Sequence, residues 1–178
     1  HKLREETLGA KFTIDTGYQG APDVHVAIER GEMLCRTVTV TAYFGREPFL
    51  TWGKNRFVRP LVQTGRKPSP LLAEVPTMYE LMDRYKTPEV GRGLATLVLA
   101  PGEFGRPIVA PPGVPAERVK LLREALNKTF RDPEFLAETK KRGWPVGPVA
   151  GEELESLAKE VIAQPPEVVQ RLKKILGE

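Results

Sequence analysis

The feature of this sequence that most constrains its fold is an alternation between short β-branched or apolar runs and segments of helical periodicity. The clearest run is Thr37-Val38-Thr39-Val40-Thr41, in which every side chain is β-branched, and such runs are typical of strands. Residues 11–16, 57–63 and 106–110 have the same character, with Pro60 hinting at an edge or a bulge in the third strand. Strands separated by helices predict an α/β protein with a largely parallel sheet.

The helical segments are marked by the residues at their ends. Thr77-Met78-Tyr79-Glu80 has the spacing of a capping box, and Asp132-Pro133 combines an N-cap residue with a first-turn proline. Glycine just past a periodic segment is a typical helix stop. These signals predict helices that end at Gly9, Gly31, Gly143 and Gly177, a short helix over 47–52, helical stretches after Thr77 and Pro88, a helix over 115–130, and one carrying Leu154, Leu157, Val161 and Ile162.

Composition excludes several classes of protein. The chain has 178 residues, 40% of them hydrophobic, with 27 Lys and Arg against 23 Asp and Glu, which is typical of a soluble globular protein. No apolar run reaches the roughly 18–20 residues of a membrane span. A single cysteine, Cys35, excludes an internal disulfide framework and a Cys-rich zinc module.

The positive charge is concentrated in one part of the chain. Residues 54–92 carry eight basic and four acidic side chains, whereas basic and acidic residues nearly balance elsewhere. A nucleic-acid interface normally has a larger basic stripe or a named motif. The surplus therefore favours a site for small anions, with no nucleic-acid partner.

No catalytic or metal-binding motif is present, so we expect no enzyme, no cofactor and no metal. His25 precedes Glu29 by one helical turn, and a solvated ion pair explains it. Cys35 has no nearby histidine, and its expected role is that of a buried structural thiol. The sequence contains no nucleophile elbow, phosphate-binding loop or dinucleotide fingerprint.

One segment has the form of a ligand site. From Thr16 to Pro22 a predicted strand passes through a glycine-containing turn into a helix, where free backbone N–H groups and the helix dipole favour an anion. Hydroxyls at alternate positions of the next predicted strand could line the same cleft. A plain strand–helix turn and simple β-propensity are the competing interpretations, and Asp23 would repel an anion unless it turns away. The candidate ligand-binding residues are Gly17, Tyr18, Gly20, Ala21, Thr39 and Thr41.

Four segments in order resemble the extracytoplasmic solute receptors of tripartite tricarboxylate transporters, the Bug family. They are Gly17-Tyr18-x-Gly20 followed by a helix and Gly31-Glu32, the stretch from Ser69 to Glu80, Ala110-Pro111-Pro112-Gly113-Val114-Pro115 before a helix, and Asp132-Pro133-Glu134 before a glycine-ended helix. Together they cover nearly the whole chain.

The resemblance implies a type II periplasmic-binding-protein-like fold, in which two α/β lobes close on a ligand between them. Residues 1–105 would form most of the second, ligand-binding lobe. Residues 106–178 would supply a crossover strand and C-terminal helices of the first lobe, so that the chain is the C-terminal part of a longer protein. The uncapped opening helix agrees with this expectation.

The function implied is that of a non-catalytic receptor in the periplasm or another extracytoplasmic space. It would capture a small organic acid and deliver it to membrane transporter subunits. The alternatives are the effector-sensing domain of a transcription regulator and an enzyme whose catalytic residues lie outside this chain. An isolated fragment would expose the apolar faces of its last helices, which favours a homodimer or strand exchange.

Overall fold

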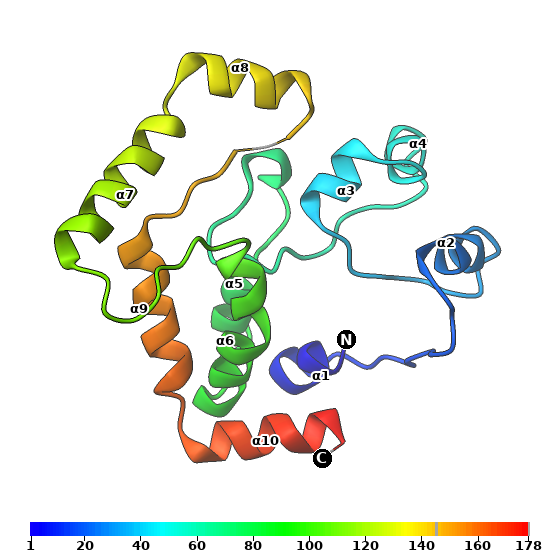
Figure 1. The fold of residues 1–178 in the computed structure, drawn as a ribbon. Coiled ribbons are helices and arrows are strands. Elements are labelled where there is room, and N and C mark those ends of the chain that lie inside the picture. The colour runs from blue at the N-terminus through cyan, green and yellow to red at the C-terminus, as the bar shows by residue number, and fades with distance from the viewer. Residues whose placement is uncertain (145, 178) are drawn as a thin grey trace. The chain divides into compact units, whose positions relative to one another are not determined.

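The computed structural model describes residues 1–144 and 146–177 (Figure 1). The chain divides into two compact units. Unit 1 comprises His1–Phe12, Pro60–Glu138 and Val146–Glu178, and unit 2 comprises Thr13–Arg59 and Thr139–Pro145. The lobe boundary expected near residue 105 stays a prediction.

The secondary structure of the described residues is helical. The α-helices are α1 (Lys2–Leu8), α2 (Ala21–Glu29), α3 (Val40–Gly45), α4 (Phe49–Lys54), α5 (Met78–Arg84), α6 (Glu89–Phe104), α7 (Ala116–Thr129), α8 (Pro133–Lys141), α9 (Gly151–Ile162) and α10 (Pro166–Leu176), with a 3₁₀ turn at Pro70–Leu72.

The predicted fold class, an α/β type II periplasmic-binding-protein-like fold, is wrong. The structure is 57% helical and 1% strand, with no sheet in the part of the chain that it describes. Residues 11–16, 37–39 and 106–110 have no strand assignment, and Val40 begins α3. In 57–63, one isolated parallel bridge joins Gln63 to Thr77. An extended segment becomes a strand only when another pairs with its backbone N–H and C=O groups, and the described residues supply no such partner.

The predicted helix boundaries are confirmed where local capping decides them. The Thr77 hydroxyl accepts from Glu80 N at 3.1 Å, and the Glu80 carboxylate accepts from Thr77 N at 2.7 Å. Asp132 accepts from Phe135 N at 2.8 Å, which caps α8. Gly9 and Gly177 end α1 and α10 in the left-handed conformation at φ 64° and 90°. Each of these caps satisfies backbone groups that a helix end leaves unpaired.

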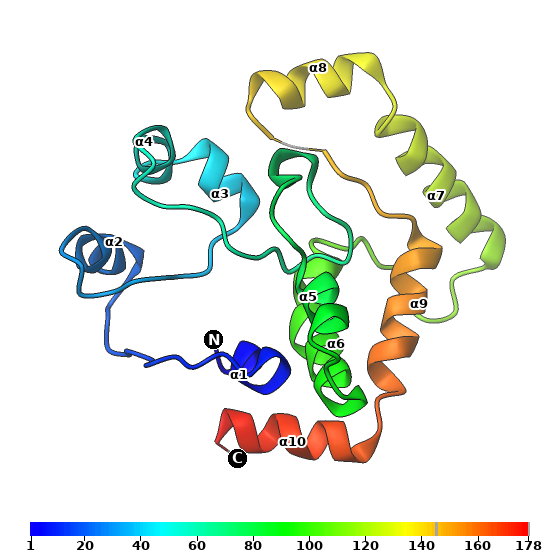
Figure 2. The same cartoon turned by 180° about the vertical axis from the view of Figure 1, so that it is seen from behind.

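Unit 1 is built around α6, which packs against α1, α9 and α10. Figure 2 shows α1 and α10 near the same end of α6. Glycine at position 93 allows the close approach to α10, because a Cβ there would lie 2.9 Å from Val168 Cγ2. A Cβ on Gly91 would lie 3.6 Å from the Glu6 carbonyl oxygen of α1. Met78, Met82 and Ala95 form the buried centre between α5 and α6.

Unit 2 has a smaller, aromatic core. Ile28 of α2 packs with Phe49 and Trp52 of α4, and partly buried residues of α2, α3 and the neighbouring segments surround them: Val24, Met33, Val38, Ala42, Tyr43 and Val58. The rings of Phe49 and Trp52 meet edge to face, with centroids 5.4 Å apart, an arrangement that aromatic pairs prefer.

Candidate functional site

The candidate residues predicted from the sequence all lie in unit 2. Gly17 has φ 106°, a conformation that favours glycine. Gly20 is the N-cap of α2 and Ala21 is its first residue, while Tyr18 is exposed in the preceding turn.

Thr39 and Thr41 occupy a helix start rather than a strand. The Thr39 hydroxyl caps α3 by accepting from Ala42 N at 3.1 Å, and Thr41 is exposed within α3. The alternation that would place their hydroxyls on one strand face therefore does not apply. Within the described residues, no hydrogen bond joins the 17–21 turn to either threonine.

A different set of residues in unit 2 has the chemistry of an anion site. We define the Arg36 site as Arg36, His25, Glu29, Phe49 and Trp52. The Arg36 guanidinium carbon lies 5.7 Å from the centre of the Phe49 ring. Its Nε and Nη1 atoms are buried, and no described residue accepts a hydrogen bond from them. A buried donor without an acceptor costs about 1–3 kcal/mol, and more when it is charged.

His25 of α2 reaches the same aromatic surface. Its ring meets Phe49 and Trp52 edge-on, with centroids 5.2 and 5.6 Å away. Its Nε2 atom is also buried and has no hydrogen-bond partner among the described residues. Burial, and then the positive charge of Arg36, lower the pKa of His25, while Glu29 opposes them.

The carboxylate of Glu29 is engaged by Trp52, whose Nε1 donates to Glu29 Oε1 at 3.0 Å. The solvated ion pair that the sequence suggested between His25 and Glu29 is therefore not the arrangement seen. Arg36 keeps unpaired donors although an acidic side chain lies in the same cluster. Burial also lowers the pKa of the Arg36 guanidinium, which still stays charged because guanidinium pKa values begin so high.

Sequence reasoning missed Arg36. The available signal was a single charge inside the largely apolar stretch from Met33 to Val40, where a charged side chain needs a partner if it is buried. Cys35, its neighbour, is a free thiol that is only partly buried.

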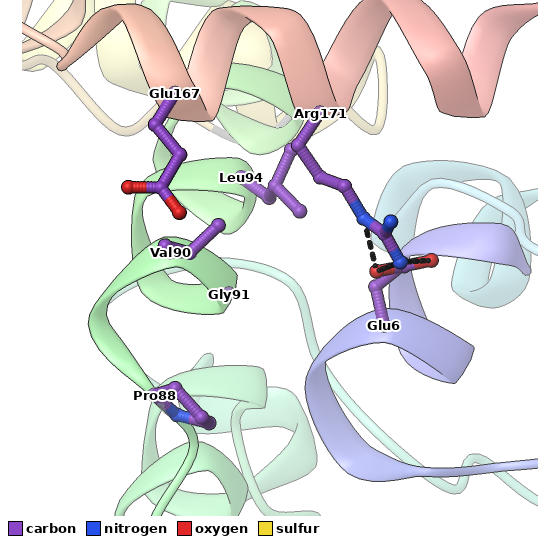
Figure 3. Close-up of a pocket in the computed structure, with 7 residues that line it drawn as sticks. All are labelled: Glu6, Pro88, Val90, Gly91, Leu94, Glu167 and Arg171. Atoms are coloured by element: carbon purple, nitrogen blue, oxygen red, sulfur yellow. Dashed lines mark hydrogen bonds and ion pairs between the residues drawn. The ribbon is translucent and has the colours of Figure 1, made fainter.

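Unit 1 contains an open cavity of about 330 Å³ (Figure 3). Arg171 of α10 forms a two-pronged ion pair with Glu6 of α1, at 2.7–2.9 Å. The lining residues are Glu6, Pro88, Val90, Gly91, Leu94, Glu167 and Arg171. The ion pair joins α1 to α10 beside an apolar floor, and its charged atoms already satisfy each other.

A second cavity, of about 490 Å³, lies between α7 and α9. Arg123 donates to Glu152 at 2.6 Å and lies 3.7 Å from Glu155. Since these side chains are substantially exposed, the groups form an ordinary surface charge network.

A third charged group ties the loop at Arg66 to α6 and α9. Arg66 donates to Glu103 and Glu160, each at 2.9 Å, and lies 5.4 Å from the centre of the Tyr79 ring. The Tyr79 hydroxyl donates to Glu103 at 3.2 Å. Burial, and then the charge of Glu103, raise the pKa of Tyr79 to about 12. Every charge in this network has a partner, so its role is structural.

Among residues 1–144 and 146–177, no group of three or more His, Cys, Asp or Glu side chains could hold a metal ion. In the same residues, no helix combines the length and the apolar character needed to cross a membrane. Comparisons with protein-family models, curated proteins and solved structures found no match. The resemblance to the receptor family stays a prediction.

Proposed function

We propose that the chain is a non-catalytic binding protein for a small organic anion, and that the anion is a carboxylate. The observation that carries this proposal is the pair of buried, unpaired donors on Arg36. A carboxylate presents two acceptor oxygens that match either the Nε/Nη2 edge or the Nη1/Nη2 edge of a guanidinium. One carboxylate would therefore satisfy one of the two donors that no described residue satisfies.

The surroundings of Arg36 favour an anion over a neutral acceptor. Phe49 and Trp52 are largely buried rings beside it, and charge–charge attraction is stronger where water is excluded. The 17–21 turn and the α3 threonines belong to the same unit, and we retain them as predicted contributors of backbone and hydroxyl donors.

The wider setting of the proposal comes from the resemblance alone. In that setting the chain captures the organic acid in an extracytoplasmic space and passes it to membrane transporter subunits.

Thermal unfolding with added organic acids tests the proposal. Succinate, citrate and benzoate are added to the full chain at matched ionic strength, and unfolding is followed by circular dichroism. At tenfold excess over the dissociation constant, a bound acid stabilises the native state by about 1.4 kcal/mol. We expect at least one acid to raise the melting temperature of the wild type.

Arg36→Met is the informative variant. It removes the fork and also the buried unpaired charge, so we expect unliganded stability to be kept or raised while the response to the acid is lost. Arg30→Gln is the matched control, because Arg30 is 69% exposed and lies 3.9 Å from Glu32. It should keep the full response. The proposal fails if no acid stabilises the wild type, or if Arg36→Met responds as the wild type does.

A further inference from the structure

We propose that a carboxylate bound at Arg36 enters the site together with a proton that is taken up by His25, so that affinity rises as the pH falls. This inference rests on the proposed function and adds how the site is regulated. Its basis is geometric: the His25 ring and the Arg36 guanidinium both contact Phe49, and each carries a buried nitrogen that pairs with no described residue.

The free site disfavours a charged His25. An imidazolium carries N–H groups on both ring nitrogens, and Nε2 has no acceptor among the described residues. The neighbouring charges act in opposite directions: Arg36 repels the imidazolium, and Glu29 on the same helix attracts it. From α4 the uncharged rings of Phe49 and Trp52 face it. Burial and Arg36 outweigh Glu29, so the pKa of His25 in the free site lies below its ordinary value.

A carboxylate reverses this balance. Its single negative charge offsets the repulsion between Arg36 and the imidazolium, and one of its oxygens can accept from Nε2–H. Each change favours the charged form and raises the pKa of His25 in the complex.

The bound state then holds more protons than the free state between the two pKa values of His25. Affinity therefore rises as the pH falls through that interval, by at most about tenfold per pH unit for one proton, and levels off below it.

The same chemistry defines the ligand class. The site offers one permanent positive charge and one that appears with the proton, and Glu29 already supplies one negative charge that acts on His25. It therefore matches a ligand with one carboxylate, such as benzoate, better than a tricarboxylate such as citrate, which would bring further negative charges without partners.

Calorimetric titration of the full chain with benzoate tests this inference. The titrations use bis-tris and imidazole, two amine buffers that do not compete for an anion site and that differ in ionisation enthalpy. They are made at pH values on both sides of about 6.5, the ordinary pKa of histidine. We expect benzoate to bind more tightly at the lower pH, with uptake of up to one proton, and citrate to bind more weakly.

His25→Gln tests whether His25 is the group that takes up the proton. Glutamine can present an N–H near the position of Nε2 at every pH but gains no positive charge. Benzoate binding should therefore weaken, and its proton uptake should disappear. His1→Gln is the control, because the only other histidine lies in unit 1, and it should leave the proton uptake unchanged.

The outcomes distinguish the two proposals. Benzoate binding with the same affinity at every pH, or proton uptake that persists in His25→Gln, overturns the inference and leaves the proposed function standing. Binding of citrate in preference to benzoate overturns the assignment of ligand class. No binding of any acid at any pH overturns the proposed function as well.

Discussion

Replacing Gly93 with alanine tests the close packing of α6 against α10. The new Cβ would lie 2.5 Å from Gln164 Oε1, 2.9 Å from Val168 Cγ2 and 3.0 Å from Val168 Cγ1. Gln164 has a flexible end that can move away. Val168 is only 3% exposed, so its methyl groups determine the cost.

Two opposing effects set the magnitude. Alanine is better than glycine inside a helix by about 1 kcal/mol, whereas overpacking a well-filled site costs about 1–3 kcal/mol. With a midrange overpacking cost of about 2 kcal/mol, we expect Gly93→Ala to lower the free energy of unfolding by about 1 kcal/mol. Val168→Ala alone should cost about 2 kcal/mol, for two lost methyl groups and the space they leave.

The double variant completes a double-mutant cycle with Gly93→Ala and Val168→Ala, and it tests whether the two side chains are in contact. In Gly93→Ala/Val168→Ala the new methyl occupies space vacated by valine, so the overpacking disappears and the helix gain remains. We expect a loss of about 1 kcal/mol instead of the additive value of about 3, a coupling of about 2 kcal/mol.

Urea unfolding followed by far-ultraviolet circular dichroism measures all four proteins. Gly102→Ala is the control in the same helix, because nothing lies within 4 Å of its new Cβ, and it should stabilise by up to about 1 kcal/mol. If Gly93→Ala stabilises as much as Gly102→Ala, or if the double variant is additive, the close contact between α6 and α10 is refuted.

Three further predictions concern unit 1. Thr77→Ala should lower the free energy of urea unfolding by about 1 kcal/mol, because it removes the cap of α5. Thr77→Ser keeps the capping hydroxyl and should therefore keep most of that stability. A double-mutant cycle with Glu6→Gln and Arg171→Gln should give a coupling below about 1 kcal/mol that shrinks with added salt, since Arg171 is 41% exposed. Tyr79 should ionise near pH 12 in an absorbance titration. The folded state keeps the Tyr79 hydroxyl proton to a higher pH than the unfolded state does. The free energy of unfolding should therefore fall as the pH rises from about 10 towards that value, and Tyr79→Phe should remove this pH dependence.

The helices were predictable because their signals are local. The capping box at Thr77 and the N-cap at Asp132 each involve residues three apart in sequence, and the stop at Gly9 depends on one backbone conformation. Such interactions form in nearly the same way whatever the rest of the chain does. The starts of α5 and α8 and the end of α1 therefore agreed with the structure, whereas α3 was not predicted and the short helix expected over 47–52 lies at Phe49–Lys54.

The strands were not predictable because a strand depends on a second segment. The β-branched run from Thr37 to Thr41 expresses a preference for a pleated, half-buried surface. No segment of residues 1–144 or 146–177 pairs with it as a strand, and Thr39 instead uses its hydroxyl to cap α3. The same side chain that favours a strand is thus also a good N-cap residue, and the alternative with a local hydrogen bond is the one observed.

The candidate site also has a part that was predictable from local signals and a part that was not. Turn chemistry correctly placed Gly17 and Gly20 in front of α2. The candidate role of Arg36 follows from its packing on Phe49 and its buried, unpaired donors, which sequence spacing does not reveal.

A purely structural role would be a poor explanation for Arg36. Its contact with Phe49 contributes about 0.5–2 kcal/mol, whereas its two buried donors together cost at least about 2 kcal/mol while they lack acceptors. An apolar side chain of similar length would fill the same space without that cost. A guanidinium is favoured at this position when an acceptor arrives from outside the described residues. Arg36→Met should therefore keep or raise the stability of the unliganded protein while it removes the response to the acid. If Arg36 served only the fold, the substitution would lower the stability instead.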